Sequence, residues 1–260
     1  MTISSGDFFW YDLMTGDPQA ATDFYAKVVG WGTEEAGVDG SSYKVLTIDG
    51  GKGMGVAGLM AMPPEAASRG APPSWNGYVY VDDVDATTRR VTEAGGAVMH
   101  EPSDIPTVGR FSVVADPQGA VFALFKPTPR DEQVEWPPYM TPGTIGWHEL
   151  HAADGTSAFD FYGKLFGWQK KEALDMGPMG TYQLFATSDQ EAGGIMTDSQ
   201  SPRPYWLYYI AVDAIDAAVE RVKAGGGEVL NGPMEVPGGA WVFQGRDPQG
   251  AIFALVAPKR

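Results

Sequence analysis

The chain carries one long pattern twice, and this internal duplication limits the fold more than any other feature of the sequence. Residues 6–31 align without gaps to residues 143–168, with eleven identities in 26 positions. Residues 116–125 (DPQGAVFALF) recur as residues 247–256 (DPQGAIFALV), with eight of ten positions identical. Copies so far apart lie well beyond the roughly 20–50-residue period of a solenoid. The sequence therefore predicts two copies of a whole domain.

Turn and helix signals indicate the elements within each copy. Asp-Pro-Gln-Gly predicts a turn, because proline restricts φ and glycine supplies a positive φ, and the apolar run after it predicts a buried strand. Asp17 and Pro18 predict a helix start, and Gly30 its end. The first half reads β-α-β-β-β twice, with residues 61–73 as a proline-rich loop, and the pattern then restarts. We expect an α+β fold.

A segment rich in proline and charge separates the two copies. Residues 127–142 have no hydrophobic periodicity, which is typical of a linker. We therefore expect one domain over residues 1–126 and a second over residues 143–260, each long enough to bury its own core. We also expect the two domains to pack on each other as a pseudo-dimer.

Composition argues against several classes of function. The net charge is −15, which disfavours binding to the phosphates of nucleic acid. There are no cysteines, so disulfides, thiolate zinc sites and a cysteine nucleophile are excluded. The sequence shows no signal peptide and no run of about 18 apolar residues that could span a membrane. We expect a cytoplasmic protein without a membrane or nucleic-acid partner.

Several motifs together resemble the vicinal oxygen chelate superfamily, which has the glyoxalase, bleomycin-resistance and extradiol-dioxygenase fold. They are D-x-x-x-A-x-x-F-Y-x-x-x-x-G-W from Asp17 to Trp31, V-D-D-V-D-A at 81–86, the A-G-G helix end at 94–96, and the D-P-Q-G turn. The resemblance implies four βαβββ modules, paired so that curved mixed sheets form a cup in each domain. More narrowly, the chain is similar to tandem glyoxalase-like proteins, also called hydroxylase-like. This superfamily contains isomerases, lyases, oxygenases and simple binding proteins, so the site must decide the function.

The same resemblance implies where metal-dependent members carry His or Glu ligands. Those positions lie on the first strand, on the strand that opens the second module, and on the last strand. In this chain they fall on Trp10, Asn76 and Ala123, and in the repeat on Trp147, Leu207 and Ala254. Indole, isobutyl and methyl groups cannot coordinate a divalent cation. We therefore expect neither the usual metal site nor a cofactor.

A different polar group stands out in the segment Trp147-His148-Glu149-Leu150-His151. Side chains alternate along a strand, so Trp147, Glu149 and His151 should share one face, with His148 on the other. The first copy has Trp10, Asp12 and Met14 at the shared-face positions. Glu149 and His151 could be an acid–base pair, two metal ligands, or a satisfied polar patch under a loop. Metal ranks last, because a third and a fourth ligand are not visible.

Aromatic residues on the predicted strands are either core or the walls of a ligand site. If they line the cups, they suit a flat, partly apolar organic ligand, with two buried carboxylates as anchors. The candidate ligand-binding residues are Trp10, Asp12, Asn76, Tyr78, Trp147 and Tyr209, and the candidate catalytic residues are Glu149 and His151. The favoured function is small-molecule binding without the usual metal. The alternative is a lyase, isomerase or hydroxylase type of enzyme that uses Glu149 and His151. The loops at 62–73 and 199–204 are expected to be rims over the cups or plain connections.

Overall fold

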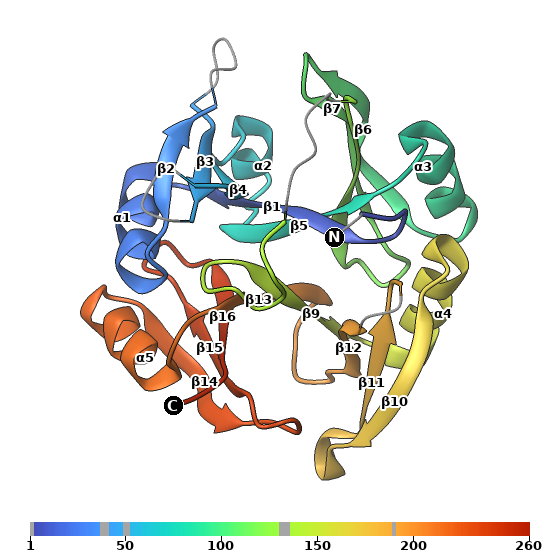
Figure 1. The fold of residues 1–260 in the computed structure, drawn as a ribbon. Coiled ribbons are helices and arrows are strands. Elements are labelled where there is room, and N and C mark those ends of the chain that lie inside the picture. Colours follow the sequence, from blue (N-terminus) through green and yellow to red (C-terminus); the bar gives the residue numbers. More distant parts are fainter. Residues whose placement is uncertain (1–2, 37–41, 49–52, 130–135, 189–190) are drawn as a thin grey trace. The chain divides into compact units, whose positions relative to one another are not determined.

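The computed structural model describes residues 3–36, 42–48, 53–129, 136–188 and 191–260 (Figure 1). Residues 130–135 of the predicted linker lie outside these ranges. The first half contains β1 (Phe8–Thr15), α1 (Pro18–Val28), β2 (Gly32–Glu35), β3 (Lys44–Thr47), β4 (Gly55–Ala61), α2 (Pro64–Ser68), β5 (Ser74–Tyr80), α3 (Val84–Glu93), β6 (Ala97–Ile105), β7 (Gly109–Ala115) and β8 (Val121–Pro127). The second half contains β9 (Ile145–Ala152), α4 (Gly155–Phe166), β10 (Gln169–Asp175), the 3-10 turn η2 (Gly177–Met179), β11 (Thr181–Ala186), β12 (Glu191–Thr197), β13 (Tyr205–Ala211), α5 (Ile215–Ala224), β14 (Glu228–Glu235), β15 (Trp241–Arg246) and β16 (Ile252–Ala257).

The strands form two eight-stranded mixed sheets of identical topology, which confirms the α+β prediction. Their orders are β2-β3-β4-β1-β5-β8-β7-β6 and β10-β11-β12-β9-β13-β16-β15-β14. In both sheets the first strand of a βαβββ module pairs in parallel with the last, as β1 with β4 and β9 with β12. The neighbouring hairpins, such as β3–β4 and β11–β12, are antiparallel. No helix among the described residues is long and apolar enough to cross a membrane.

The first helix of each copy begins as the sequence predicts. Asp17 is the N-cap of α1 and accepts the amide of Ala20 at 3.0 Å, while Asp154 caps α4 through the amides of Thr156 and Ser157. Each cap satisfies amides that have no partner within the helix. Helix α4 ends at Phe166 and is capped by Gly167, whose φ of 78° is a left-handed conformation that glycine adopts without strain.

The predicted loop at residues 61–73 contains a short helix that the sequence analysis missed. Helix α2 has Pro64 in its first turn, no side-chain cap and no buried residue. Proline is compatible with the first helical position, because the missing N–H would have no partner there anyway. The proline-rich composition concealed this turn of helix.

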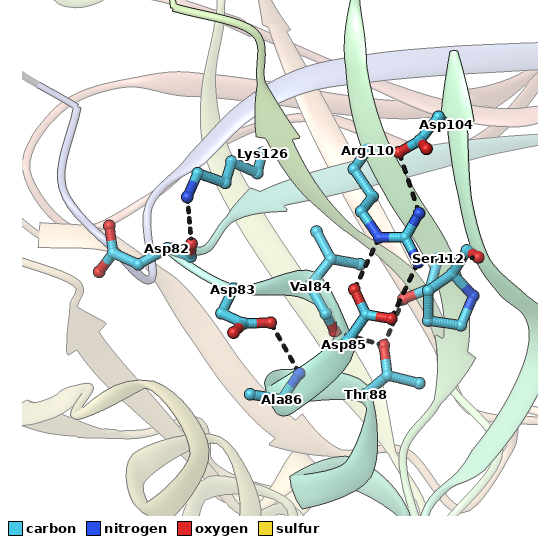
Figure 2. Close-up of polar contacts among 11 residues, drawn as sticks. Asp82, Asp83, Val84, Asp85, Ala86, Thr88, Asp104, Arg110, Ser112 and Lys126 are labelled. Carbon is cyan, nitrogen blue, oxygen red and sulfur yellow. Dashed lines mark hydrogen bonds and ion pairs between the residues drawn. The ribbon is translucent and has the colours of Figure 1, made fainter.

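Acidic residues of the motif at 81–86 cap helix α3 and bind the sheet (Figure 2). The side chain of Asp83 caps the helix by accepting the amide of Ala86 at 2.9 Å. Asp85 accepts two hydrogen bonds from the guanidinium of Arg110 on β7, and Asp104 accepts a third. This pairing holds the pKa of the Asp85 carboxyl below its usual value. The acidic motif therefore ties the helix start to the sheet.

The contacts group the chain into two compact units, and each unit combines segments of both halves. Unit 1 comprises Met1–Phe9, Asn76–Trp136 and His148–Leu207. Unit 2 comprises Trp10–Trp75, Pro137–Trp147 and Tyr208–Arg260. Long-range bonds within each unit come in matching pairs. The indole of Trp31 donates to the carbonyl of Gly143 in unit 2, as that of Trp168 does to Gly6 in unit 1.

In each unit, an arginine on the helix of one half's second module caps the helix of the other half's first module. In unit 1, Arg90 of α3 donates to the carbonyl of Leu165, near the end of α4, at 2.7 Å. In unit 2, Arg221 of α5 donates twice to the carbonyl of Val28, the last residue of α1. A cation at a helix C-terminus satisfies free carbonyls and favours the helix dipole.

The two repeated motifs bind each other within each unit. In unit 2, the phenol of Tyr25 on α1 donates to Asp247 at 3.1 Å, and the indole of Trp75 donates to the Tyr25 oxygen at 2.9 Å. In unit 1, Tyr162 of α4 and Asp116 repeat this contact. Each aspartate also accepts amides of its own D-P-Q-G turn through its other oxygen. The Phe-Tyr motif of one half therefore holds the turn of the other half.

We predict that Tyr25→Phe lowers the free energy of unfolding by about 1–3 kcal/mol, because it removes a donor to a buried carboxylate and the acceptor of the Trp75 indole. Tyr162→Phe should cost a similar amount in unit 1. Denaturant unfolding measures both values.

Tyr80→Phe is the matched control, because its hydroxyl bonds only at an exposed position, to Asp82 at 3.3 Å. We expect it to change the unfolding free energy by less than about 0.5 kcal/mol. Equal losses in all three variants would show that the buried bonds contribute no more than a surface contact.

Candidate functional site

Strand β9 places Glu149 and His151 side by side, as alternation along a strand predicts. Both are buried, with 7% and 6% of their surface exposed. Nε2 of His151 lies 2.7 Å from Oε1 of Glu149. The pair is therefore in direct contact and shielded from water.

Three further side chains of unit 1 complete the group, which we call the Glu149 cluster: Glu149, His151, Tyr182, Asp198 and Tyr205. The phenol of Tyr182 on β11 donates to Oε2 of Glu149 at 2.8 Å. Oδ2 of Asp198, just after β12, lies 2.9 Å from Nδ1 of His151. The ring of Tyr205, at the start of β13, stacks on the imidazole with centroids 4.5 Å apart. The loop at 199–204 is thus bounded at both ends by contacts to His151.

Burial and neighbouring charges shift the pKa values of several groups in the Glu149 cluster. Burial lowers the pKa of His151, but the hydrogen bonds and negative charges of Glu149 and Asp198 outweigh it, so the pKa is raised overall. Burial raises the pKa of Asp198, yet the bonds from His151 and the loop amides bring it below the usual value. Burial and the two neighbouring carboxylates raise the pKa of Tyr205 to about 12.

His148 lies on the other face, as predicted, and has a different character. Its ring stacks on Phe8 with centroids 4.3 Å apart, and Nδ1 lies 2.6 Å from the carbonyl oxygen of Ala192. Burial lowers its pKa to about 4, so it is neutral at pH 7. It belongs to the packed core of unit 1.

Unit 2 holds the matching group of the first half. The phenol of Tyr43 donates to Oδ1 of Asp12 at 2.5 Å, and the indole of Trp10 lies within hydrogen-bonding distance of both, at 3.1 Å from Asp12 and 2.8 Å from Tyr43. Asp12 is 5% exposed. Met14 takes the position of His151, so this carboxylate has a phenol partner but no imidazole.

A glycine beside each carboxylate makes room for the tyrosine ring. Asp12 is in register with Gly58 on β4, and Glu149 with Gly194 on β12. A methyl group at Gly58 would overlap the phenol of Tyr43, and one at Gly194 would overlap the ring of Tyr182. Glycine is therefore required at both positions for the tyrosine to reach the carboxylate.

The other candidate residues lie on the predicted strands. Asn76 is buried and Tyr78 is partly exposed on β5 in unit 1, with Tyr78 in register with Ala123. In unit 2, Trp147 is partly exposed on β9. Tyr209 on β13 is buried, in register with Ala254, and its hydroxyl accepts the side-chain amide of Gln244 at 2.9 Å. These four candidates are therefore divided equally between the two units.

Sequence analysis missed four members of the two groups: Tyr43, Tyr182, Asp198 and Tyr205. A signal for the tyrosines exists, since Tyr43-Lys-Val-Leu and Tyr182-Gln-Leu-Phe lie at matching places in the two copies. Asp198 and Tyr205 have no counterpart in the first half and could not be found by comparing the copies.

The residues at the positions where the resemblance implies metal ligands do not fit a divalent cation. Trp10, Ala123, Trp147, Leu207 and Ala254 have no suitable donor atom, and the amide of Asn76 is a single weak one. Across the described ranges, no three His, Asp or Glu side chains form a group that could hold a metal ion. In the Glu149 cluster the imidazole stands between the two carboxylates, with one nitrogen bonded to each.

The duplicated topology and motifs agree with a match to a known family. The sequence model of the Glyoxalase/Bleomycin resistance protein/Dioxygenase superfamily matches residues 8–124 and again residues 144–255. The chain belongs to this superfamily. It does so as a tandem protein with two such domains.

Relatives in this superfamily align over nearly the whole chain. "Putative glyoxylase CFP32" of Mycobacterium tuberculosis is 34% identical over 252 residues, which cover 96% of this chain and 94% of that protein. Anthracycline biosynthesis protein DnrV of Streptomyces peucetius is 33% identical over 259 residues, with 95% and 91% covered. The Mn(II)-bound glyoxalase of Novosphingobium aromaticivorans shares the fold, with a TM-score of 0.66 and 18% identity over 98% of this chain and 82% of its own.

We predict that His151→Met, which copies the first half, destabilises the protein more at low pH than at high pH. A histidine whose pKa is raised on folding adds stability that is fully present below its unfolded value of about 6.5 and is lost as pH rises through the folded value. The loss at pH 6 should be about 1–3 kcal/mol and should shrink at higher pH. Unfolding in denaturant at several pH values measures it.

His148→Gln is the control with the opposite sign. Its folded pKa is depressed, so the stability contributed by neutral His148 is present above about pH 6.5 and is lost as pH falls toward about 4. A pH-independent effect of His151→Met would contradict the contacts drawn for the Glu149 cluster.

Proposed function

We propose that this chain binds a small, flat and partly apolar organic molecule, and that the molecule is held without the superfamily's usual metal. The observation that carries this proposal is the buried carboxylate that each half holds with a tyrosine hydroxyl: Asp12 with Tyr43, and Glu149 with Tyr182. Each carboxylate lies two residues along the first strand from Trp10 or Trp147, and therefore on the same face as the position where the resemblance implies a ligand in metal-dependent members.

Stability alone does not account for these pairs. Burying a carboxylate costs free energy even when it is hydrogen-bonded, and an apolar side chain of similar volume is often at least as stable. The two copies have diverged at most positions, yet both retain a carboxylate, a tyrosine and the glycine that makes room for it. Functional sites are where such costly polar groups gather.

Aromatic side chains near these positions supply the apolar part of a ligand site. Trp10, Tyr78 and Trp147 remain partly exposed on strands whose other face is core. Aromatic walls with a few polar anchors are typical of sites for drug-sized organic molecules. The relatives named for anthracycline biosynthesis support an organic ligand of this flat kind.

We predict that organic ligands found in a thermal-shift screen bind equally well with and without EDTA. Glu149→Gln should weaken binding about tenfold or more if the ligand contacts this carboxylate, because a charged hydrogen bond contributes about 1.5–3 kcal/mol. Tryptophan fluorescence titration measures the dissociation constants.

Asp12→Asn is the matched change in the first half. Weaker binding in this variant as well would show that both sites bind the ligand. Asp160→Asn on an exposed face of α4 is the neutral control. Complete loss of binding on chelation would refute the metal-independent site.

The second candidate is an enzyme of the lyase, isomerase or hydroxylase type. It is favoured by the 2.7 Å contact between His151 and Glu149, which is within the range for proton transfer. In this reading the second half carries the chemistry, because Met14 replaces the imidazole in the first half.

If the protein is such an enzyme, His151→Ala should reduce kcat by about 100-fold or more, the usual contribution of a positioned acid or base. Met14→Ala, at the matching position, should leave kcat unchanged. Steady-state kinetics of the two variants, on any substrate identified in the screen, measures this difference in kcat. Full activity of Glu149→Ala would show that Glu149 and His151 are not a catalytic pair.

A further inference from the structure

The Glu149 cluster contains one imidazole between two carboxylates, and the bonds around it define where the protons are. Oε2 of Glu149 accepts the phenol of Tyr182, and Oδ1 of Asp198 accepts the amides of Gln200 and Ser201. Both carboxylates thus accept hydrogen bonds from donors on the side away from His151, as charged acceptors do.

Each carboxylate turns its other oxygen toward a different nitrogen of His151. The distances are 2.7 Å to Nε2 and 2.9 Å to Nδ1. An ionised carboxylate can only accept, so both nitrogens must donate, and only the imidazolium donates from both. Among the described residues, the groups that face this ring are the carboxylates of Glu149 and Asp198 and the phenol ring of Tyr205, and Tyr182 acts through Glu149.

We propose that Asp198 is a positioning residue that holds His151 as an imidazolium, so that the Glu149 cluster gives a proton to its ligand rather than taking one. The ligand it suits carries a carbonyl or another oxygen on which negative charge develops. This ligand class rests on the proposed function, whereas the protonation state of His151 does not.

The proton transfer involves Nε2 of His151, Glu149 and the ligand oxygen. The proton on Nε2 moves to Oε1 of Glu149 and from there to the ligand oxygen, where a new O–H bond forms and Glu149 is left ionised as before. The N–H bond at Nε2 breaks, and His151 is left neutral with its remaining proton at Nδ1, directed at Asp198. The first half has Met14 in place of the imidazole and cannot supply a proton in this way.

The free protein tests the protonation state by nitrogen-15 NMR of its three histidines. Loss of one set of signals in His151→Gln assigns the ring. We expect both His151 nitrogens to carry protons at pH 7 and the ring to titrate above the value of a free histidine. A His151 that is neutral at pH 7 in the wild-type spectrum would overturn the proposal.

Two carboxylate variants test the part played by Asp198. Asp198→Asn should lower the pKa of His151, whereas Asp160→Asn, which removes an exposed charge from α4 of the same unit, should leave it unchanged. Asp198→Glu keeps the charge, so the pKa of His151 should stay raised in this variant. It is also the control for misfolding of Asp198→Asn. An unchanged titration in Asp198→Asn would refute the positioning role.

The dye alizarin, a flat hydroxylated quinone whose colour reports its ionisation, tests the direction of transfer. We expect the bound dye to stay protonated at a pH where the free dye ionises, and to lose this protection in His151→Met. Ionised dye at the site would show a base and overturn the proposal. Absence of alizarin binding would refute the ligand class, while the NMR result would stand separately.

Discussion

The hydrogen bond between a helix tyrosine and the aspartate of a D-P-Q-G turn is the contact on which each unit depends. One oxygen of the aspartate organises its own turn, and the other accepts the phenol of a helix from the other half of the chain. Burial raises the pKa of both aspartates, because a buried carboxylate loses the hydration that stabilises its charge. A buried carboxylate destabilises the folded state unless its hydrogen-bond partners are in place. The turn, the helix and the neighbouring tryptophan therefore depend on one another for stability.

The candidate sites are variations on one duplicated arrangement. In both halves a carboxylate on the first strand, a tyrosine near the start of the third strand and a glycine on the fourth fit together. The second half adds a histidine, an aspartate and a stacked tyrosine, so that one imidazole lies between two carboxylates. The first half has methionine at the histidine position, and there a phenol and an indole bind the carboxylate. The same backbone therefore presents two different chemistries.

Much of the fold could be predicted because its signals are local. Asp17 and Asp154 cap helices within three residues, and the glycine of each D-P-Q-G turn adopts the positive φ that its sequence suggests. Glu149 and His151 could be paired in advance because they are two residues apart on one strand. The short helix α2 escaped prediction, since a proline-rich segment can start a helix as readily as it forms a loop.

The sequence by itself determined that the chain contains two copies of one domain, where the first helix of each copy begins, and that Glu149 and His151 share one face of a strand. Only the tertiary structure decided which groups meet: Tyr182 reaches Glu149 from 33 residues away, and Asp198 reaches His151 from 47. It also decided that the motifs of one half bind those of the other. The physical reason is that these contacts depend on strand register and on burial, which arise only when distant segments pack, whereas turns and caps are set by the residues beside them.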